Sequence, residues 1–298
     1  MQLSVVIPVY NTVEGLDELS RRVGDVLAQH STNDGELILV DDCSPNPDTW
    51  PTLKAVAETH EHVRLIQLTR NFGQQAATLA GLEAARGDLM LTMDDDLQHA
   101  PEDIPLLLQH AENDIVIGQF PKRRHGVFKR FTSWLKGWFD HLLIGRPRHI
   151  RTTSFRCLKR TVVDGMLRFR TPHPFVPALM FHVSRDIIGV DVSHSARKEG
   201  KTGYSLRKLI GLFSNLLINN SAFLMRVVGA LGTIAALASF GVLGWVLWRK
   251  LADNVPIMGW SSLMAASLFL GGMMLLSIGL VGEYLIRAIE ASEGKPSW

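Results

Sequence analysis

Short apolar runs alternate with segments of helical spacing through the first part of the chain. The runs cover Leu3 to Val9, Glu36 to Val40, Val63 to Leu68, Leu89 to Met93 and Ile115 to Gly118. This alternation is typical of an α/β domain with a largely parallel sheet. In such sheets, ligands bind beyond the carboxyl ends of the strands. We therefore expect a binding site in the loops that begin at Pro8, Asp41, Thr69 and Asp94.

The pattern changes after residue 125. From Gly126 to Leu143 and from Leu206 to Leu217, apolar residues recur at three and four positions, with Lys and Arg between or beside them. Such amphipathic helices either pack on a domain core or lie in a membrane interface. The interface is favoured because long apolar runs follow.

Two of these runs carry no charged residue, Val227 to Trp248 and Val255 to Gly282. Each exceeds the roughly 20 residues that a helix needs to cross a bilayer. Buried core helices are the alternative, although two such runs in succession are unusual in one soluble domain. The sequence thus predicts three parts: an α/β domain at residues 1–125, a region with interfacial helices at 126–220, and two transmembrane helices with a short tail at 221–298.

The composition of the chain also indicates the compartment in which the α/β domain is expected. The chain enters its first apolar run without the basic segment of a signal peptide, which predicts that the α/β domain stays in the cytoplasm. Cys43 and Cys157 are the only cysteines, as expected in a reducing compartment. Basic residues crowd the stretch from Lys122 to Arg151, which suggests attraction to anionic lipids or phosphates. No nucleic-acid-binding motif occurs, so nucleic acid is the weaker alternative.

Three adjacent carboxylates, Asp94, Asp95 and Asp96, close the fourth apolar run. Hard cations such as Mg²⁺ or Mn²⁺ take oxygen ligands and are commonly held by one or two carboxylates plus substrate phosphates. A solvated acidic turn is the alternative for the triplet alone, because charged clusters are ordinary in loops.

Four motifs occur in register at the predicted strand ends. They are SVVIPVYN at residues 4–11, LVDDCS at 39–44, RNFGQ at 70–74 and MDDDLQ at 93–98. With these motifs and its apolar tail, the chain resembles the GT-A glycosyltransferases of family 2, and within them the polyprenyl-phosphate glycosyltransferases. The resemblance covers nearly the whole chain and implies a Rossmann-like, mostly parallel sheet followed by interfacial and transmembrane helices.

The resemblance implies a nucleotide site built from three of these motifs. Its expected members are Pro8, Tyr10, Asn11, Asp41, Asp42, Arg70, Asn71 and Gly73. The Asp41–Asp42 pair would reach the base and ribose, with an N-cap role as the alternative. Many relatives have Glu after the Tyr-Asn pair, whereas this chain has Thr12, so the acidic contact of the pocket is left open. The Ala-rich helix that begins at Gln74 is interpreted as a packing element.

The acidic triplet matches the D-x-D pair of the family. By resemblance, Asp96 and Gln98 are direct ligands of Mg²⁺ or Mn²⁺, and Asp94 makes a ribose or water-mediated contact. Asp95 is expected to point away. The metal would neutralise charge that develops on the leaving diphosphate.

The segment from Ser154 to Arg160 matches the acceptor-side block of the family. Ser154 and Lys159 stand where many relatives carry acidic residues, which excludes a carboxylate base at either position. An acceptor phosphomonoester has a second pKa near 6 and is already largely anionic at neutral pH. Arg156 and Arg160 are therefore expected to grip it, since a guanidinium binds phosphate in a bidentate manner.

The segment from His194 to Ser205 matches a mobile loop of the family. The expected diphosphate contact is Arg197, assisted by Lys198 or Lys201, with Tyr204 and Ser205 as loop anchors. A solvated basic loop is the alternative.

Together these features lead us to expect an inverting, metal-dependent transfer of a monosaccharide from a nucleotide-diphosphate sugar, with UDP as the expected nucleotide, to undecaprenyl phosphate. The protein would be a multi-pass protein of the bacterial inner membrane and would supply a lipid-linked sugar for cell-envelope glycans such as lipopolysaccharide. A catalytically silent nucleotide-sugar-binding or scaffolding subunit is the alternative. A polysaccharide synthase is disfavoured because the chain has no Q-x-x-R-W motif. Relatives form tetramers, and the sequence leaves a homotetramer open.

Overall fold

The computed structural model describes residues 1–32, 35–120, 147, 150–169, 171, 174–193, 234, 241, 245, 248 and 259–292. The chain divides into two compact units. The first comprises Met1–Gly203 with Gly294–Trp298, and the second comprises Tyr204–Glu293. All the described strands lie in the first unit.

The first unit is built on a sheet that has seven strands within the described residues, in the order β3-β2-β1-β4-β6-β5-β7. The strands are β1 (Leu3–Val9), β2 (Glu36–Asp41), β3 (Val63–Gln67), β4 (Leu89–Thr92), β5 (Ile115–Gln119), β6 (Arg156–Lys159) and β7 (Ile187–Asp191). All pairings are parallel except those of β6, which runs antiparallel to β4 and β5. The five predicted strands and their largely parallel arrangement are confirmed. Because β6 and β7 follow residue 125, the sheet takes strands from both sides of the predicted domain boundary, and that division stays a prediction.

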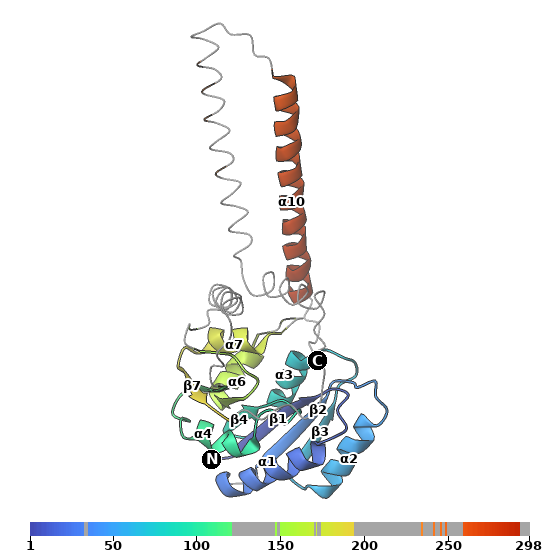
Figure 1. The fold of residues 1–298 in the computed structure, drawn as a ribbon, viewed down its shortest axis with the longest axis vertical. Helices are drawn as coiled ribbons and strands as arrows, with labels where there is room; N and C mark the ends of the chain where they lie inside the picture. Colours follow the sequence, from blue (N-terminus) through green and yellow to red (C-terminus); the bar gives the residue numbers. More distant parts are fainter. Residues whose placement is uncertain are drawn as a thin grey trace. The chain divides into compact units, whose positions relative to one another are not determined.

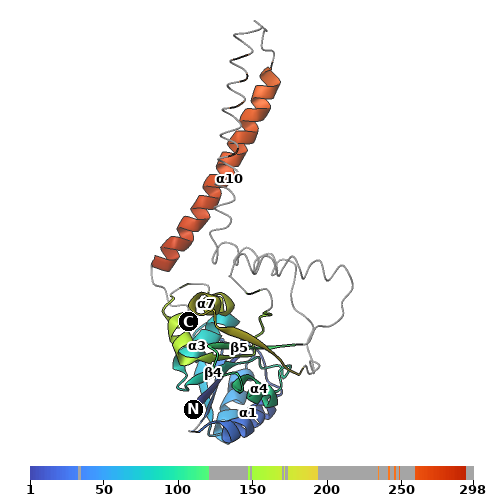
Figure 2. The ribbon, with the colours of Figure 1, turned by 90° about the vertical axis from the view of Figure 1, so that its left-hand side faces the viewer.

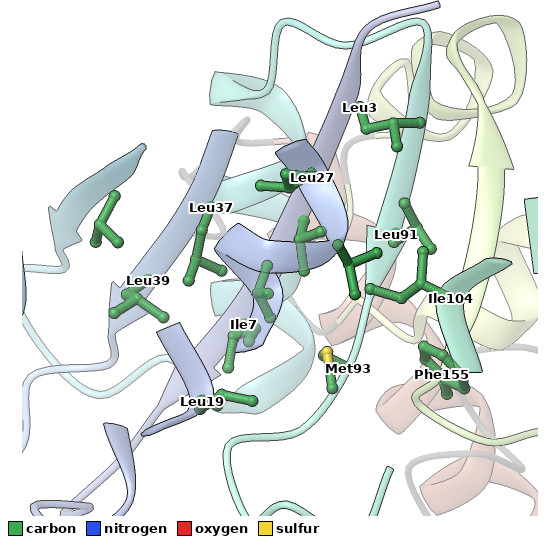
Figure 3. Packing of buried hydrophobic residues seen from close by; sticks show 14 of the residues in the cluster. Leu3, Ile7, Leu19, Leu27, Leu37, Leu39, Leu91, Met93, Ile104 and Phe155 are labelled. Atoms are coloured by element: carbon green, nitrogen blue, oxygen red, sulfur yellow. The ribbon is translucent and has the colours of Figure 1, made fainter. Parts of the chain in front are cut away.

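Helices cover both faces of the sheet (Figures 1 and 2). One face carries α1 (Leu16–His30), α2 (Thr49–Thr59), the short 3₁₀ helix η1 (Pro101–Asp103) and α4 (Ile104–Leu108). The other carries α3 (Gln74–Ala84), α6 (Arg160–Leu167) and α7 (Val176–Val183). Neighbouring residues of a strand point to opposite faces, so Ile7 joins the first core and Val6 the second. Figure 3 shows Ile7, Leu39 and Leu91 within the first core.

Polar side chains tie the amino ends of the central strands together. The buried Glu36 carboxylate accepts hydrogen bonds from Ser4 Oγ (2.7 Å), the Arg86 N–H (2.6 Å) and the Arg64 guanidinium. At the same end, Arg160 donates to the carbonyls of Ala85 (2.8 Å) and Gly87 (2.6 Å). We call this group of contacts the amino edge.

The second unit contains α10 (Trp260–Ser292), a helix of 33 residues. Many of its described large apolar side chains are exposed, whereas Met273 is half-buried. The exposed ones are Leu263, Phe269, Leu270, Met274, Ile278, Val281 and Leu285. Among the residues that the structure describes, no helix is found with the length and apolar character needed to cross a membrane. Both predicted interfacial helices and most of the first predicted span lie outside the described residues.

Candidate functional site

The loops that follow β1, β2, β3 and β4 meet at the opposite end of the sheet, which we call the carboxyl edge (residues 8–14, 41–48, 68–74 and 93–99). Three residues there that are not glycine adopt left-handed backbone conformations, Asn11 (φ 62°), Cys43 (φ 53°) and Leu97 (φ 56°). Such conformations cost of the order of 1–3 kcal/mol each and cluster at binding and active sites. The non-glycine residues with positive φ in the described chain therefore lie where the sheet fold places a ligand.

A cavity of about 250 Å³ opens at this edge. It is lined by Pro8, Val9, Tyr10, Asp42, Asn71, Gly73, Gln74 and Asp95. Five of these residues were predicted from the motifs, and they come from the loops after β1, β2 and β3. Asp95 adds the loop after β4, and all four loops meet because parallel strands end at one edge. Val9, Gln74 and Asp95 were not predicted as site residues.

Asp42 shapes the cavity wall through backbone contacts. Its two carboxylate oxygens accept the N–H groups of Phe72 and Gly73, each at 2.8 Å. Burial raises the pKa of Asp42, and these two hydrogen bonds oppose the rise. The N-cap of α2 is Asp48, so neither acid of the Asp41–Asp42 pair takes the N-cap alternative. Asp42 thus fixes the loop before α3 while it lines the cavity.

Asp41 is buried beside the cavity and is engaged within the chain. Its Oδ1 accepts hydrogen bonds from the N–H (3.0 Å) and Oγ (2.6 Å) of Ser44, and its Oδ2 accepts one from Gln67 Nε2 (3.1 Å). Asn11 joins the same loop: its N–H donates to Ser44 Oγ (2.9 Å), and its Oδ1 accepts the N–H of Asn46 (3.1 Å). These contacts hold the β1 and β2 loops against each other, and the predicted base and ribose contacts stay a prediction.

Arg70 is exposed on the β3 loop. Its guanidinium carbon lies 4.4 Å from the centre of the Phe72 ring, in cation–π contact. This stacking holds the side chain beside the cavity-lining residues Asn71 and Gly73.

Asp94 is held by two neutral donors. Gln74 Nε2 donates to Oδ1 (2.6 Å), and Ser154 Oγ donates to Oδ2. Ser154 is itself anchored, because its carbonyl accepts a hydrogen bond from Thr92 Oγ1 (2.6 Å). The prediction that the helix beginning at Gln74 serves only for packing is therefore wrong for Gln74 itself. Sequence spacing could not show this contact, because it joins the loop after β4 to the start of α3.

Asp95 and Asp96 have different surroundings. Asp96 Oδ1 accepts the N–H of Gln98 (3.1 Å). Asp95 lines the cavity, so the prediction that it points away is wrong. Its Oδ2 accepts a hydrogen bond from Thr12 Oγ1 (2.6 Å). Burial raises the pKa of Asp95 to about 6, the charges of Asp94 and Asp96 add to the rise, and the Thr12 hydroxyl opposes it.

The triplet offers a partial set of metal ligands. Within the part of the chain that the structure describes, no three His, Cys, Asp or Glu side chains come together in a group that could hold a metal ion. Asp94, Asp96 and Gln98 supply only oxygen donors near one another in sequence, which is the chemistry that a hard cation takes. Mg²⁺ in particular is usually bound through one or two carboxylates and completed by phosphates and water. The residues thus fit a cation shared with a bound diphosphate.

Of the two predicted acceptor arginines, Arg156 begins β6 and Arg160 follows the last residue of β6. Arg156 pairs with Thr92 near the carboxyl edge and is 5% exposed, and its Nε donates to the Thr153 carbonyl. Burial lowers the pKa of Arg156 to about 10, while attraction to Asp94 opposes the shift. Arg160 lies at the amino edge, and because a strand rises about 3.3 Å per residue the pair cannot converge on one phosphate. The prediction that both arginines bind the same acceptor phosphate is therefore wrong.

Lys159 also lies away from the carboxyl edge. Its Nζ donates to the Glu112 carbonyl (2.7 Å) and to Asp114 Oδ1 (3.2 Å). The predicted loop residues lie outside the described residues, and their roles stay predictions: Arg197, Lys198, Lys201, Tyr204 and Ser205.

The fold is that of a three-layer α/β domain with a largely parallel sheet, a class of protein that binds its ligands at the carboxyl ends of the strands. The family model of Glycosyl transferase family 2 matches residues 4–168, and the chain belongs to this family of glycosyltransferases. It is 32% identical to an undecaprenyl-phosphate 4-deoxy-4-formamido-L-arabinose transferase of Photorhabdus laumondii, over 100% of this chain and 92% of the relative. It is 34% identical to a protein of the same name from Pseudomonas fluorescens, over 99% of this chain and 87% of the relative.

Solved structures give the same fold. Glucosyl-3-phosphoglycerate synthase of Mycobacterium tuberculosis, in complex with UDP, superposes with a TM-score of 0.53 at 15% identity, over 72% of this chain and 77% of that one. The same enzyme has been solved with Mn²⁺, UDP and phosphoglyceric acid, and this structure also superposes with a TM-score of 0.53, at 17% identity over 72% and 75% of the chains. The α/β sheet of this chain is thus of the GT-A type.

Proposed function

We propose that the protein transfers a monosaccharide from a nucleotide-diphosphate sugar, with UDP as the nucleotide, to undecaprenyl phosphate. The observation that carries the proposal is the carboxyl edge itself. The cavity, the acidic triplet and the Ser154 loop meet there, although they come from distant parts of the sequence. The full-length relatives named for transfer to undecaprenyl phosphate support the choice of acceptor.

The donor nucleotide would occupy the cavity. Tyr10 is 48% exposed there, and an aromatic ring can stack on a nucleobase. Asp42 holds the backbone of the 72–73 turn in place by accepting two N–H groups, so the wall is formed before the ligand arrives. Such preorganisation reduces the entropy lost on binding.

The reaction would be a single displacement at the anomeric carbon. An acceptor phosphate oxygen forms the new bond on one face of the sugar, the bond to the donor diphosphate breaks on the other, and the nucleoside diphosphate leaves with the bonding electrons. Configuration at the anomeric carbon is thereby inverted. Since the phosphate is already anionic near pH 7, Ser154 need not act as a base and can serve to orient Asp94.

Asp96 and Gln98 would hold a Mg²⁺ or Mn²⁺ ion, with Asp94 beside them, and such an ion offsets negative charge on a leaving diphosphate. Arg156 stabilises the position of Asp94, because its buried guanidinium attracts the Asp94 carboxylate. We therefore assign Arg156 to positioning Asp94.

Membrane anchorage follows from the acceptor, which is a lipid. We assign the uncharged runs at 227–248 and 255–282 to two spans of the bacterial inner membrane, with the first unit in the cytoplasm. Washing isolated membranes with alkaline carbonate should leave the protein in the pellet, and its release into the supernatant would contradict the two spans.

The activity can be tested directly on the full chain in detergent. The protein is incubated with undecaprenyl phosphate, Mn²⁺ and a panel of UDP-, GDP- and dTDP-linked sugars that includes UDP-4-deoxy-4-formamido-L-arabinose. Lipid products are then identified from their masses by mass spectrometry. We expect one donor to yield an undecaprenyl-phosphate sugar and free nucleoside diphosphate. Nucleotide binding without product from any donor would instead support a binding or scaffolding subunit.

A further inference from the structure

Gln98, one of the two residues assigned to the cation, lies between neighbours that are fixed in different ways. Leu97 has a left-handed backbone conformation (φ 56°), and His99 is buried, with 4% of its surface exposed. Gln98 itself is half-buried, and its N–H donates to Asp96 Oδ1 (3.1 Å). The turn from Asp96 to Gln98 therefore joins the two expected ligands by a hydrogen bond across Leu97.

Leu97 is held by the start of helix α1. Its side chain packs against the first core, and Gly15 approaches it so closely that a Cβ atom there would lie 3.3 Å from Leu97 Cδ1. Gly15 is the N-cap residue of α1 and has φ 79°. A leucine in the left-handed conformation carries backbone strain, and such strain persists only where the surrounding packing maintains it. The contact with α1 therefore keeps the 96–98 turn in its strained form.

His99 is held by two aromatic rings. The centroids of the His99 and Phe120 rings lie 4.6 Å apart with a tilt of 43°, and those of His99 and Phe155 lie 5.2 Å apart in an edge contact at 62°. Phe155 is fully buried in the first core (Figure 3). Tilted and edge-on ring pairs of this kind stabilise beyond the area that they bury. Residue 99 is thus fixed to the body of the domain.

The segment that holds His99 also holds Asp94. Ser154 donates to Asp94 Oδ2, and the next residue, Phe155, contacts His99. The loop 94–99 is therefore attached at both ends to residues 154–155, while Leu97 attaches its middle to α1. Metal ligands bind best when the residues around them are themselves held by packing and hydrogen bonds.

We propose that Leu97 and His99 are positioning residues for the cation, which fix the backbone on either side of Gln98 so that Asp96 and Gln98 are arranged before the ion binds. The inference rests on the proposed function, because it concerns the cation of the same donor site. Neither Leu97 nor His99 would touch the cation, and each acts through the backbone of Gln98.

The test measures cation binding and not turnover. Mn²⁺ is titrated into the full chain in detergent together with one nucleoside diphosphate, chosen from UDP, GDP and dTDP as the one that the native protein binds most tightly in EDTA. The electron paramagnetic resonance signal of free Mn²⁺ gives its dissociation constant, after correction by a titration of the nucleotide alone. Calorimetry in EDTA gives the affinity for the nucleotide without the cation.

The first variants change the ring at position 99. Loss of a contact that supports metal ligands typically costs about 10- to 100-fold in metal affinity, and we expect this loss of Mn²⁺ affinity in His99→Ala. His99→Phe keeps a flat ring beside Phe120 and Phe155 and should bind Mn²⁺ almost as the native protein does. His62→Ala is the matched control, because it removes a half-buried histidine whose Nε2 contacts the Ser20 carbonyl (3.0 Å). Both alanine variants should lower the melting temperature, but only His99→Ala should weaken Mn²⁺ binding.

The second variants change the strained turn. Leu97→Gly relieves the backbone strain and removes the contact with Gly15, so these two effects on the melting temperature should offset each other. The turn then has more backbone freedom to lose when the ion binds, and Mn²⁺ affinity should fall about 5- to 30-fold. Leu97→Met keeps an apolar side chain of similar volume and should bind Mn²⁺ as the native protein does. A residue that served only the fold would not lower metal affinity without lowering stability.

The outcomes separate this inference from the proposed function. If Leu97→Gly or folded His99→Ala binds Mn²⁺ as tightly as the native protein, the inference is wrong and the proposed function stands. It is also wrong if His99→Phe loses as much Mn²⁺ affinity as His99→Ala, or if these variants bind the nucleotide more weakly in EDTA. Should His99→Ala not fold, His99→Phe and the Leu97 variants decide. A native protein that binds the nucleotide but no Mn²⁺ would refute both the inference and the metal dependence of the proposed transfer.

Discussion

The carboxylates at the two edges of the sheet differ in the groups that donate hydrogen bonds to them. At the amino edge, Glu36 is paired with the Arg64 guanidinium and with two neutral donors. At the carboxyl edge, the hydrogen bonds described for Asp42, Asp94 and Asp95 come only from neutral groups. Neutral donors orient a carboxylate without cancelling its charge.

The pKa shifts follow this division. Burial alone would raise the pKa of Glu36, but hydrogen bonds from Ser4, Arg64 and the Arg86 N–H outweigh it, and the pKa lies below its usual range. At the other edge, burial dominates and the pKa values of Asp42 and Asp95 are raised. The amino edge is thus a closed network that stabilises the fold, and the carboxyl edge keeps negative charge that a ligand or cation can match.

The largest expected effect concerns the carboxyl edge. Asp96→Ala should lower kcat for sugar transfer by about 1,000-fold, because loss of a metal ligand removes several kcal/mol of charge stabilisation at tenfold per 1.36 kcal/mol. The melting temperature should change little. Steady-state kinetics with undecaprenyl phosphate measure the first quantity and thermal unfolding the second, and a variant with native kcat would refute the assignment.

The reverse pattern is expected at the amino edge. Glu36→Gln weakens a buried, charged acceptor of three hydrogen bonds and should lower the free energy of unfolding by about 1–3 kcal/mol without changing kcat. Denaturant unfolding provides the measurement. The exposed Glu58→Gln on α2 is the matched control and should be neutral. A large loss of kcat in a folded Glu36→Gln protein would show that the two edges are not separate in function.

A smaller effect should follow from disorienting Asp94. Ser154→Ala removes one of its two neutral donors and should lower kcat about tenfold with little change in KM for the donor. Ser184→Ala is the matched control, because it breaks a comparable bond from Ser184 Oγ to Asp114 (2.8 Å) far from the cavity. Equal losses of kcat in both variants would mean that the effect is not local to the site.

The smallest effect is the pH dependence of the amino edge. Glu36 has a folded-state pKa below its unfolded value of 4.5, so its contribution is present above pH 4.5 and is lost as pH falls through the folded-state pKa. The difference in stability between the native protein and Glu36→Gln should therefore shrink as the pH drops below about 4.5. Unfolding curves recorded from pH 7 to pH 3 measure this difference in stability. A difference that grows on acidification would contradict the expected direction.

Local patterns in the sequence were sufficient to predict the strands and the edge of the sheet at which the candidate site lies. The run from Leu3 to Val9 predicts β1 with its observed bounds, because both of its faces are buried and its residues except Ser4 are apolar. The motif residues Pro8, Tyr10 and Gly73 meet at one cavity because parallel strands all end there. These features depend on periodicity and on the direction of strands, which a sequence carries locally.

Contacts between distant loops could not be predicted in the same way. The bonds of Gln74 and Ser154 to Asp94 join residues 20 and 60 positions apart, and neither side chain has an unusual local pattern. Arg160 was expected to act with Arg156 because both guanidinium groups lie in the segment that resembles the acceptor-side block of the family, but the direction of β6 carries Arg160 to the amino edge. Register and strand direction decide these contacts, and both are set by the whole sheet.

Hydrogen exchange of the full chain, measured by mass spectrometry with and without UDP and Mn²⁺, tests the central division between the two edges most directly. We predict that ligand slows exchange in peptides that cover residues 8–14, 68–74 and 93–99. Peptides around Glu36 and residues 85–87 at the amino edge should be unchanged. Protection at the amino edge, with none at the carboxyl edge, would contradict the account.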